Sequence, residues 1–311
     1  MTQPCQHGRQ HVKAPGRGMN APMQTPSPLA TTLADAASRE CRRALRALGD
    51  TQHRHRGIHE ARKSLRRLKS LLRLGTTTFA DALPSLEKAI DRLAVGLSPL
   101  RDAHVAVETA TSLAGSLAVD VEACAGAGPE SWGRAIDLLT LRCEGRLTAA
   151  LTKDPGFERR RSEVRMLARQ VHALPWQAMT TEEIDHALAH SERRVAKARK
   201  RMRKSASVAN LHRWRRRARR LRMQLELVRK ARKAAGLPAP HHADREKALA
   251  KDMSLLSDAI GARQDLRLLR DILRTLVDAD TAPALVAATT RALKLRRIPV
   301  GTPTLVVTPP A

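Results

Sequence analysis

The sequence predicts an all-α fold in which two pseudo-symmetric antiparallel helical bundles, of the four-helix-bundle type, surround a basic central groove. Ala, Leu, Arg and Lys, which are strong helix formers, make up much of the chain. Alternating β-branched runs are nearly absent, and the one β-like stretch, residues 305–307, lies in a Pro/Thr-rich tail and is expected to be unpaired. A basic amphipathic segment occurs twice, at residues 58–72 and 211–225, which indicates an internal repeat.

The first half is divided into helices by proline and glycine. Residues 1–28 carry Pro, Gly, Gln and His without apolar periodicity, so we expect a disordered leader, with Met19 or Met23 as an alternative start. The first bundle is expected over about 29–174, and Gly75 suits the end of its second helix. Amphipathic periodicity predicts its helices at 29–49, 52–74, 85–97, 100–117, 131–151 and 157–173.

The second half begins after Pro175, which marks the midpoint of the chain. A second bundle is expected over about 176–295, followed by a disordered Pro/Thr-rich tail at 296–311. Gly236 and the two prolines after it end the second basic helix. The helices predicted here are 181–204, a basic helix that ends near 235, 242–260, 263–278 and 282–295.

Helical geometry separates the residues of the repeated segment into an apolar row and a basic row. At about 100° per residue, positions that recur at steps of three and four share one face. The apolar rows are Ile58, Ala61, Leu65, Leu68 and Leu72 in the first copy and Leu211, Trp214, Ala218, Leu221 and Leu225 in the second. The basic rows, one residue out of phase, are His59, Arg62, Arg66, Lys69 and Arg73 in the first copy and His212, Arg215, Arg219 and Arg222 in the second. Each basic row therefore borders the core, in which we place Trp214.

The basic rows are an unfavourable way to keep a helix soluble. Long cationic side chains do solubilise helices by reaching into water, and that is the simplest interpretation of a charged face. Here, however, like charges lie three and four residues apart, where each pair destabilises a helix by a few tenths of a kcal/mol. Because alternating signs would serve solubility better, the rows indicate an anion-binding surface.

The net charge of +27, from 57 Lys and Arg against 30 acids, points to a polyanionic partner. Residues 193–233 hold 19 Lys and Arg and a single acid, Glu226. Two Phe, three Trp and no Tyr provide few platforms for base stacking, although a duplex can be bound through its phosphates alone. No apolar run reaches the length of a membrane span and the apolar rows lack interfacial aromatics, so no membrane partner is expected.

A second pair of matched segments supports the repeat. Residues 97–105 resemble residues 260–268, with Asp102 opposite Asp265 at an offset of 163. We expect these carboxylates to cap a helix or to pair with a motif arginine. A pseudo-twofold relation between the halves would bring the two basic rows to one shared groove.

The residues needed for an enzyme or for a metal centre are not evident. The sequence has no GxxxxGK[ST] loop and no dense carboxylate set, so no catalytic activity and no cofactor are expected. Its four cysteines show no CxxC spacing, which argues against a zinc knuckle or a disulfide framework and fits a reducing cytoplasm. His55 and His59 lie four residues apart and could chelate a metal, but no third ligand is evident, so none is predicted.

The repeated pattern His-x-x-Arg-[Lys/Arg]-x-x-Arg-Arg-Leu-[Lys/Arg], with a later Arg-Asp or Gln-Asp segment in each half, resembles the CHAD domain family over about residues 29–295. The resemblance implies two four-helix bundles around a basic channel that binds inorganic polyphosphate, with association with polyphosphate granules in the cytoplasm. The chain lacks the ExExK motif of the CYTH domain that accompanies many relatives, so it resembles a standalone version. Where the family often has a second Asp in each acidic segment, this chain has His104 and Arg267.

The resemblance also implies a set of ligand residues. Carried onto this sequence, the polyphosphate ligands are His59, Arg62, Lys63, Arg66, Lys69, Arg73, His212, Arg215, Arg216, Arg219 and Arg222. The two histidines either carry charge when a polyanion raises their pKa or orient the neighbouring arginines. The main alternative function is sequence-nonspecific nucleic-acid binding, and a second alternative is a polyphosphate kinase or phosphatase.

Overall fold

The computed structural model describes residues 27–117, 127–278, 280–296 and 298, and within these ranges it contains helices and no strands. The all-α fold class is therefore confirmed. The leader up to residue 26, both alternative start methionines and the β-like stretch at 305–307 lie outside the described residues, as does most of the tail. Within the described part, no helix combines the length and apolarity that a membrane crossing requires.

The helices lie close to the segments that the periodicity predicted. The first half contains α1 (Pro28–Gly49), α2 (Arg54–Leu72), α3 (Leu83–Gly96), α4 (Ser98–Leu117), α5 (Pro129–Lys153) and α6 (Glu158–His172), with a 3₁₀ turn at Pro155–Phe157. After a second 3₁₀ turn at Trp176–Ala178, the second half contains α7 (Thr181–Lys204), α8 (Val208–Ala234), α9 (Ala243–Leu276) and α10 (Ala282–Leu295). Side chains cap α7 and α8, since the hydroxyls of Thr180 and Ser207 accept hydrogen bonds from the backbone N–H three residues on.

The prediction of two helices at 242–260 and 263–278 is wrong, because α9 runs without a break for 34 residues. Gly261 lies inside α9, and a Cβ atom there would lie 2.3 Å from a guanidinium nitrogen of Arg215. This glycine therefore makes room for the close approach of an arginine from α8 and does not end a helix.

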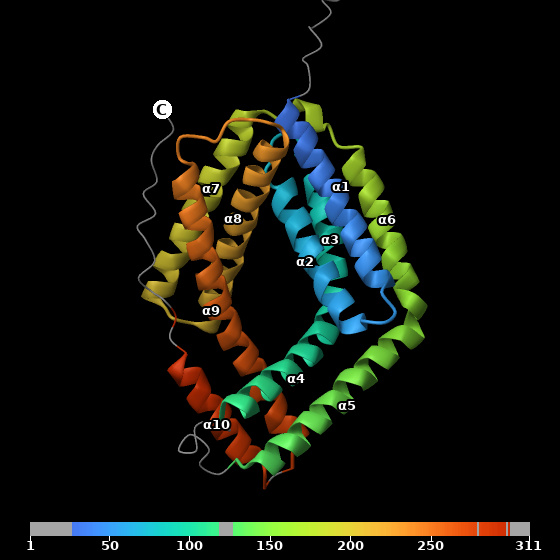
Figure 1. Cartoon of the computed structure of the whole chain (residues 1–311), viewed down its shortest axis with the longest axis vertical. Coiled ribbons are helices and arrows are strands. Elements are labelled where there is room, and N and C mark those ends of the chain that lie inside the picture. Colours follow the sequence, from blue (N-terminus) through green and yellow to red (C-terminus); the bar gives the residue numbers. More distant parts are fainter. Residues whose placement is uncertain (1–26, 118–126, 279, 297, 299–311) are drawn as a thin grey trace, which may run out of the picture.

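The helices are arranged as two sides that meet at both ends of the molecule (Figure 1). In that view α1, α2, α3 and α6 form one side, while α7, α8 and the first part of α9 form the other. The end of α9 joins α4, α5 and α10 at the lower end of the molecule. At the upper end α8 contacts both α1 and α2, and the hydroxyl of Thr32 donates a hydrogen bond to the carbonyl oxygen of Ala231 at 3.3 Å.

The buried apolar residues form two clusters. The larger one draws mainly on α1, α2, α3, α6, α7, α8 and the first half of α9, with Leu100 of α4 and Leu147 of α5, so it contains residues from both halves of the sequence. The smaller one joins α4 and α5 to the end of α9 and to α10. All ten residues of the two predicted apolar rows are buried, and Trp214 is only 1% exposed, which confirms its place in the core. Burial of these rows fixes the direction in which the adjacent basic rows face.

Candidate anion-binding groove

The two motif helices touch at equivalent positions of the repeat. The side-chain amide of Gln224 in α8 donates a hydrogen bond to the carbonyl oxygen of Ser70 in α2 at 3.1 Å. The hydroxyl of Ser70 also lies 3.7 Å from the sulfur of Met223, and the repeat offset of 153 matches these two residues to each other. The contact therefore brings the basic rows of the two halves side by side, as the pseudo-twofold relation predicted.

A cavity of about 670 Å³ lies where the two rows meet. Ten of its seventeen lining residues are Lys or Arg, and Asp91 is the one acid among them. The cationic lining residues are Arg62, Arg66, Lys69, Arg73, Arg194, Arg213, Arg216, Arg217, Arg219 and Arg220. We call this cavity the basic groove. Such a concentration of one sign of charge against low-dielectric walls attracts anions.

The arginines of the groove are partly desolvated and repel one another. Burial, and then the charges of Arg66 and Arg215, lower the pKa of Arg219 to about 9. Burial and the neighbouring guanidinium groups likewise lower the pKa of Arg66 and of Arg217 to about 10 and that of Arg220 to about 9. These side chains remain protonated at neutral pH, so the groove holds closely spaced positive charge that an anion would relieve.

Two cations of the first copy have acidic partners. The ammonium group of Lys69 lies 2.6 Å from a carboxylate oxygen of Asp91. The guanidinium of Arg73 makes a two-pronged contact with the carboxylate of Glu87, with one N–O distance of 2.5 Å. Such partly exposed ion pairs contribute little to stability, so a phosphate can compete for these cations.

Arg62 and Arg215 hold each motif helix to its neighbour. Arg62 donates to the carbonyl oxygen of Ala94 and, at 2.8 Å, to the hydroxyl of Ser98. Arg215 donates to the carbonyl oxygen of Ser257 at 3.0 Å. The offset of 163 that matches the two aspartates also matches Ala94 to Ser257, so the same anchor occurs in both halves. Nη1 of Arg62, and Nε and Nη1 of Arg215, are therefore already used within the fold.

The other predicted ligands are divided between the groove and its surroundings. His212 lines the groove, and its Nδ1 lies 2.9 Å from the amide nitrogen of Gln264. His59 instead lines a separate cavity of about 610 Å³ beside α4, α9 and α10. Lys63 pairs with Glu60 of its own helix at 3.2 Å, and Arg222 lies 3.5 Å from Glu226. Of the predicted set, the groove therefore brings together Arg62, Arg66, Lys69, Arg73, His212, Arg216 and Arg219.

Four lining arginines were not in the predicted set. Arg213, Arg217 and Arg220 belong to α8 but lie outside its regular basic row, and Arg194 comes from α7. Arg73, Arg194 and Arg220 also line a neighbouring cavity of about 730 Å³, in which the other charged residues are Glu182 and Glu183, so these arginines mark the edge of the cationic lining. Arg220 belongs to the repeated motif, at the position that matches Arg67. The signal for the other three arginines was the density of charge over residues 193–233.

The two aspartates of the second matched segment do not cap helices, because both lie inside a helix, Asp102 in α4 and Asp265 in α9. Both lie 3.2 Å from the guanidinium of Arg101, which is not a motif arginine. Asp102 belongs to the first half and Asp265 to the second, so Arg101 bridges the two halves. Each aspartate also opposes the burial that lowers the pKa of the motif arginine of its own half, Arg62 or Arg215.

Comparisons with known proteins agree with this architecture. A family model described as the CHAD domain matches residues 32–274. The chain is similar to the crystal structure of the CHAD domain from the plant Ricinus communis, with a TM-score of 0.64 and 17% sequence identity over 93% of this chain and 94% of that one. It is also similar to PptA from Streptomyces chartreusis, with a TM-score of 0.53 and 16% identity over 87% and 95% of the two chains. No curated protein sequence matches the chain significantly.

Proposed function

This chain belongs to the CHAD domain family, and we propose that it binds inorganic polyphosphate in the basic groove without turning it over chemically. The observation that carries the proposal is the convergence of cations from both halves of the repeat, ten of them against one acid, in a single cavity. The family resemblance supplies the identity of the polymer, and the groove supplies a surface of matching charge.

The chemistry of the lining suits a polymer of phosphate. Polyphosphate carries roughly one negative charge per unit and presents no base edges, so it is bound through charge and geometry. Arginine forks hold adjacent phosphate oxygens in bidentate fashion, whereas lysine acts as a point charge. The ten cations that line the groove are more than a single phosphate can contact, which favours an extended ligand.

The proposed ligands fall into two groups. Arg66, Arg216 and Arg219 from the predicted set, with Arg194, Arg217 and Arg220 in addition, would bind phosphate directly. Lys69 and Arg73 would exchange their carboxylate partners for phosphate. Arg62 and Arg215 would contribute mainly by holding α2 and α8 in place.

The lining of the groove also bears on the nucleic-acid alternative. No Phe or Trp is among the described residues that line it, so bases would find no platform on which to stack. A duplex bound through its phosphates is then the competitor to test. We expect long-chain polyphosphate to displace a bound oligonucleotide, and the reverse competition to be inefficient.

A titration with polyphosphate of graded length at two salt concentrations tests the proposal. With about eight contacts, the logarithm of the affinity should fall against the logarithm of salt with a slope near −5 to −6, by analogy with single-stranded nucleic acids. Duplex DNA that wins at equal charge concentration would contradict the assignment. A phosphate-release assay with and without Mg²⁺ separates binding from turnover, and we expect no release.

Binding of this kind would place the protein at cytoplasmic polyphosphate granules. A fluorescent fusion should therefore gather at granules in phosphate-rich cells and spread when the polymer is removed. A fusion that lacks the α8 arginines of the groove should stay diffuse under both conditions. Granule association of that variant would show that another surface is responsible.

A further inference from the structure

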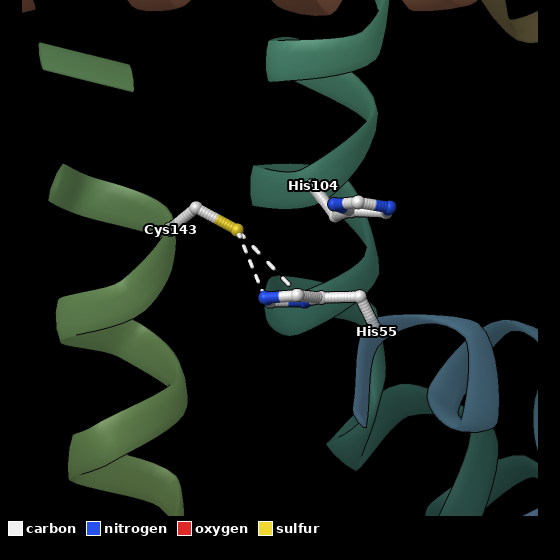
Figure 2. Close-up of side chains that lie close together, drawn as sticks. All are labelled: His55, His104 and Cys143. Atoms are coloured by element: carbon white, nitrogen blue, oxygen red, sulfur yellow. Dashed lines mark hydrogen bonds between the residues drawn. The ribbon is translucent and has the colours of Figure 1, made fainter. Parts of the chain in front are cut away.

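Three potential metal ligands meet where α2 approaches α4 and α5 (Figure 2). His55 comes from the first turns of α2, His104 from α4 and Cys143 from α5. Each offers one donor atom, and the three donor atoms lie within 4.8 Å of one another. The sulfur of Cys143 lies 3.8 Å from Nε2 and 3.9 Å from Nδ1 of His55, and the two imidazole rings stack with their centroids 4.5 Å apart. His59, the partner first considered for His55, lies elsewhere and lines the cavity beside α4 and α9.

We propose that His55, His104 and Cys143 bind a divalent transition metal ion, zinc above all, with the carboxylate of Glu144 as the fourth ligand. Imidazole nitrogen, thiolate sulfur and carboxylate oxygen are the ligand types that zinc takes, and four of them complete a tetrahedral site. The site is separate from the basic groove, and the proposal does not depend on polyphosphate binding.

The distances between the donor atoms are only slightly longer than those of a tetrahedral zinc site. With zinc bonds of about 2.0–2.1 Å to nitrogen and about 2.3 Å to sulfur, the donors of a tetrahedral site lie about 3.3–3.8 Å apart. The separations between His55 and Cys143 are already close to this range, and Glu144 lies 3.0 Å from Nε2 of His55. The parallel rings, which are inclined by 7°, must tilt toward each other so that their lone pairs converge.

The local charges favour a cation, although the chain as a whole is strongly basic. Glu144 lies beside His55, and Glu108 lies 3.5 Å from Nε2 of His104. Once Cys143 is ionised, these carboxylates and the thiolate give the site a negative charge, with Arg146 as the nearby cation that acts on the sulfur. Glu108 is placed to orient His104, as carboxylates commonly do beside metal-bound histidines.

Metal binding requires Cys143 to lose its proton, which makes binding depend on pH. Burial, with the charge of Glu144, raises the pKa of the Cys143 thiol to about 11. Burial lowers the pKa of His104, so its ring is neutral at neutral pH and offers a lone pair. Metal binding would therefore form a metal–sulfur bond, break the S–H bond and release that proton to solvent.

A metal here would join helices from the two buried clusters. The apolar residues of α2 belong to the larger cluster, whereas α4 and α5 contribute most of the first-half residues of the smaller one. The ion would therefore tie the start of the first motif helix to the lower end of the molecule, and bound metal would raise the melting temperature by mass action.

Cobalt(II) provides the direct test, since it takes zinc sites and reports its ligands in the visible and near-ultraviolet spectrum. Untagged full-length protein, freed of metal by a chelator and kept free of polyphosphate, is titrated with Co²⁺. We expect one ion per chain, tetrahedral visible bands, a sulfur-to-cobalt band in the near ultraviolet and displacement by Zn²⁺.

The four cysteines of the chain offer a matched control. Replacing Cys5, Cys41 and Cys124 by Ser leaves Cys143 as the single thiol, and this variant should keep the sulfur-to-cobalt band. Cys143→Ser, with the other three thiols intact, should lose it. A band that persists in Cys143→Ser, or one lost from the variant that retains Cys143 alone, would overturn the assignment.

The histidines require their own variants. His55→Ala and His104→Ala should each weaken Co²⁺ binding at least about tenfold, with helicity by circular dichroism unchanged. Unaltered affinity in both variants, or no metal retained by the wild type, would contradict the site. Polyphosphate titrations of the same variants should match the wild type, so failure of the metal site and failure of the proposed polyphosphate function remain distinguishable.

Discussion

The two motif helices carry the same pattern of charge but balance it differently. In the first half, α3 supplies Asp91 to Lys69 and Glu87 to Arg73. Under the offset of 163, the counterparts of these acids in α9 are Ser254 and Ala250, which carry no charge. Arg222 of the second copy lies 3.4 Å from the hydroxyl of Ser254 and otherwise relies on Glu226.

The two copies of the repeat therefore differ in how much of their positive charge is compensated by acidic residues. Three cations of the first copy, Lys63, Lys69 and Arg73, have acidic partners in their own half. The second copy holds more arginines whose pKa values are lowered by burial and by one another. The repeat therefore conserves the anchors, Arg62 and Arg215, while the groove takes most of its uncompensated charge from α8. We expect ligand affinity to depend more on the second copy.

The largest expected effect comes from removing matched charges in each copy. Replacing Arg216, Arg219 and Arg220 by Gln should weaken polyphosphate binding at least about 100-fold at low salt, since three contacts of about 1 kcal/mol each are lost. The salt slope should become shallower by about 2. Fluorescence titration at several salt concentrations measures both, and circular dichroism checks that the variant remains helical.

The equivalent residues of the first copy are the control for that variant. Lys63, Arg66 and Arg67 match the α8 triplet one by one, and replacing them by Gln removes the same charge. Only Arg66 of these three lines the groove, so we expect a loss of about fivefold. Equal losses from the two triplets would show that total charge matters and that the asymmetry of the groove does not.

A reciprocal exchange of one acid sharpens the comparison further. Asp91→Ser should free Lys69 and tighten polyphosphate binding about threefold to fivefold, since partly exposed ion pairs contribute up to about 1 kcal/mol. Ser254→Asp should place a carboxylate against Arg222. Arg222 does not line the groove, but its charge acts on Arg66 and Arg219, so the new carboxylate should weaken binding by a similar factor. The double exchange should return the affinity close to that of the wild type.

The melting temperature of the ligand-free protein tests the effect of the same two substitutions independently of ligand binding. Asp91→Ser should lower it and Ser254→Asp should raise it, because the carboxylate relieves repulsion in one copy or the other. Since Asp258 lies 3.2 Å from the Ser254 hydroxyl, helicity of that variant must be checked as well. Affinity changes of the same sign in both single variants would rule out the proposed asymmetry.

Sequence periodicity was sufficient for the parts of the molecule that depend on local pattern. The apolar rows determine which faces of α2 and α8 are buried, and the basic rows follow one residue later. The predicted break between residues 260 and 263 was wrong, because Gly261 lies inside α9 and admits Arg215 from another helix, a contact between distant segments. In the same way, Arg194 reaches the groove only because α7 packs beside α8.

The cluster of His55, His104 and Cys143 is a second case in which contacts between distant segments could not be predicted from local pattern. The sequence pairs His55 with His59 by helical spacing, yet neighbours on one helix can point into different cavities. The observed partners of His55 come from α4 and α5, so no local spacing could reveal them. The one trace in the sequence was His104, which stands where the family resemblance leads one to expect an aspartate.

The smallest expected effect is a pH dependence that separates the two motif histidines. Burial, followed by the charges of Arg216 and Arg215, lowers the pKa of His212, and burial followed by Arg66 lowers that of His59. Both rings are therefore neutral in the ligand-free protein at neutral pH. Their contribution to stability is present above the unfolded pKa of about 6.5 and is lost as the pH falls toward the lower folded values.

Bound polyphosphate should shift the pKa of His212 upwards, opposite to the shift in the ligand-free protein, and should not affect His59. A bound polyanion raises the pKa of a histidine that lines the groove, so binding takes up a proton and should tighten modestly, about twofold to threefold, from pH 8 to pH 6. His212→Ala should flatten this profile, whereas His59→Ala should leave it unchanged because His59 lies in the separate cavity. Affinity measured across this pH range in the two variants distinguishes a histidine that meets the ligand from one that does not, and a profile flattened by His59→Ala would place the polymer in the other cavity.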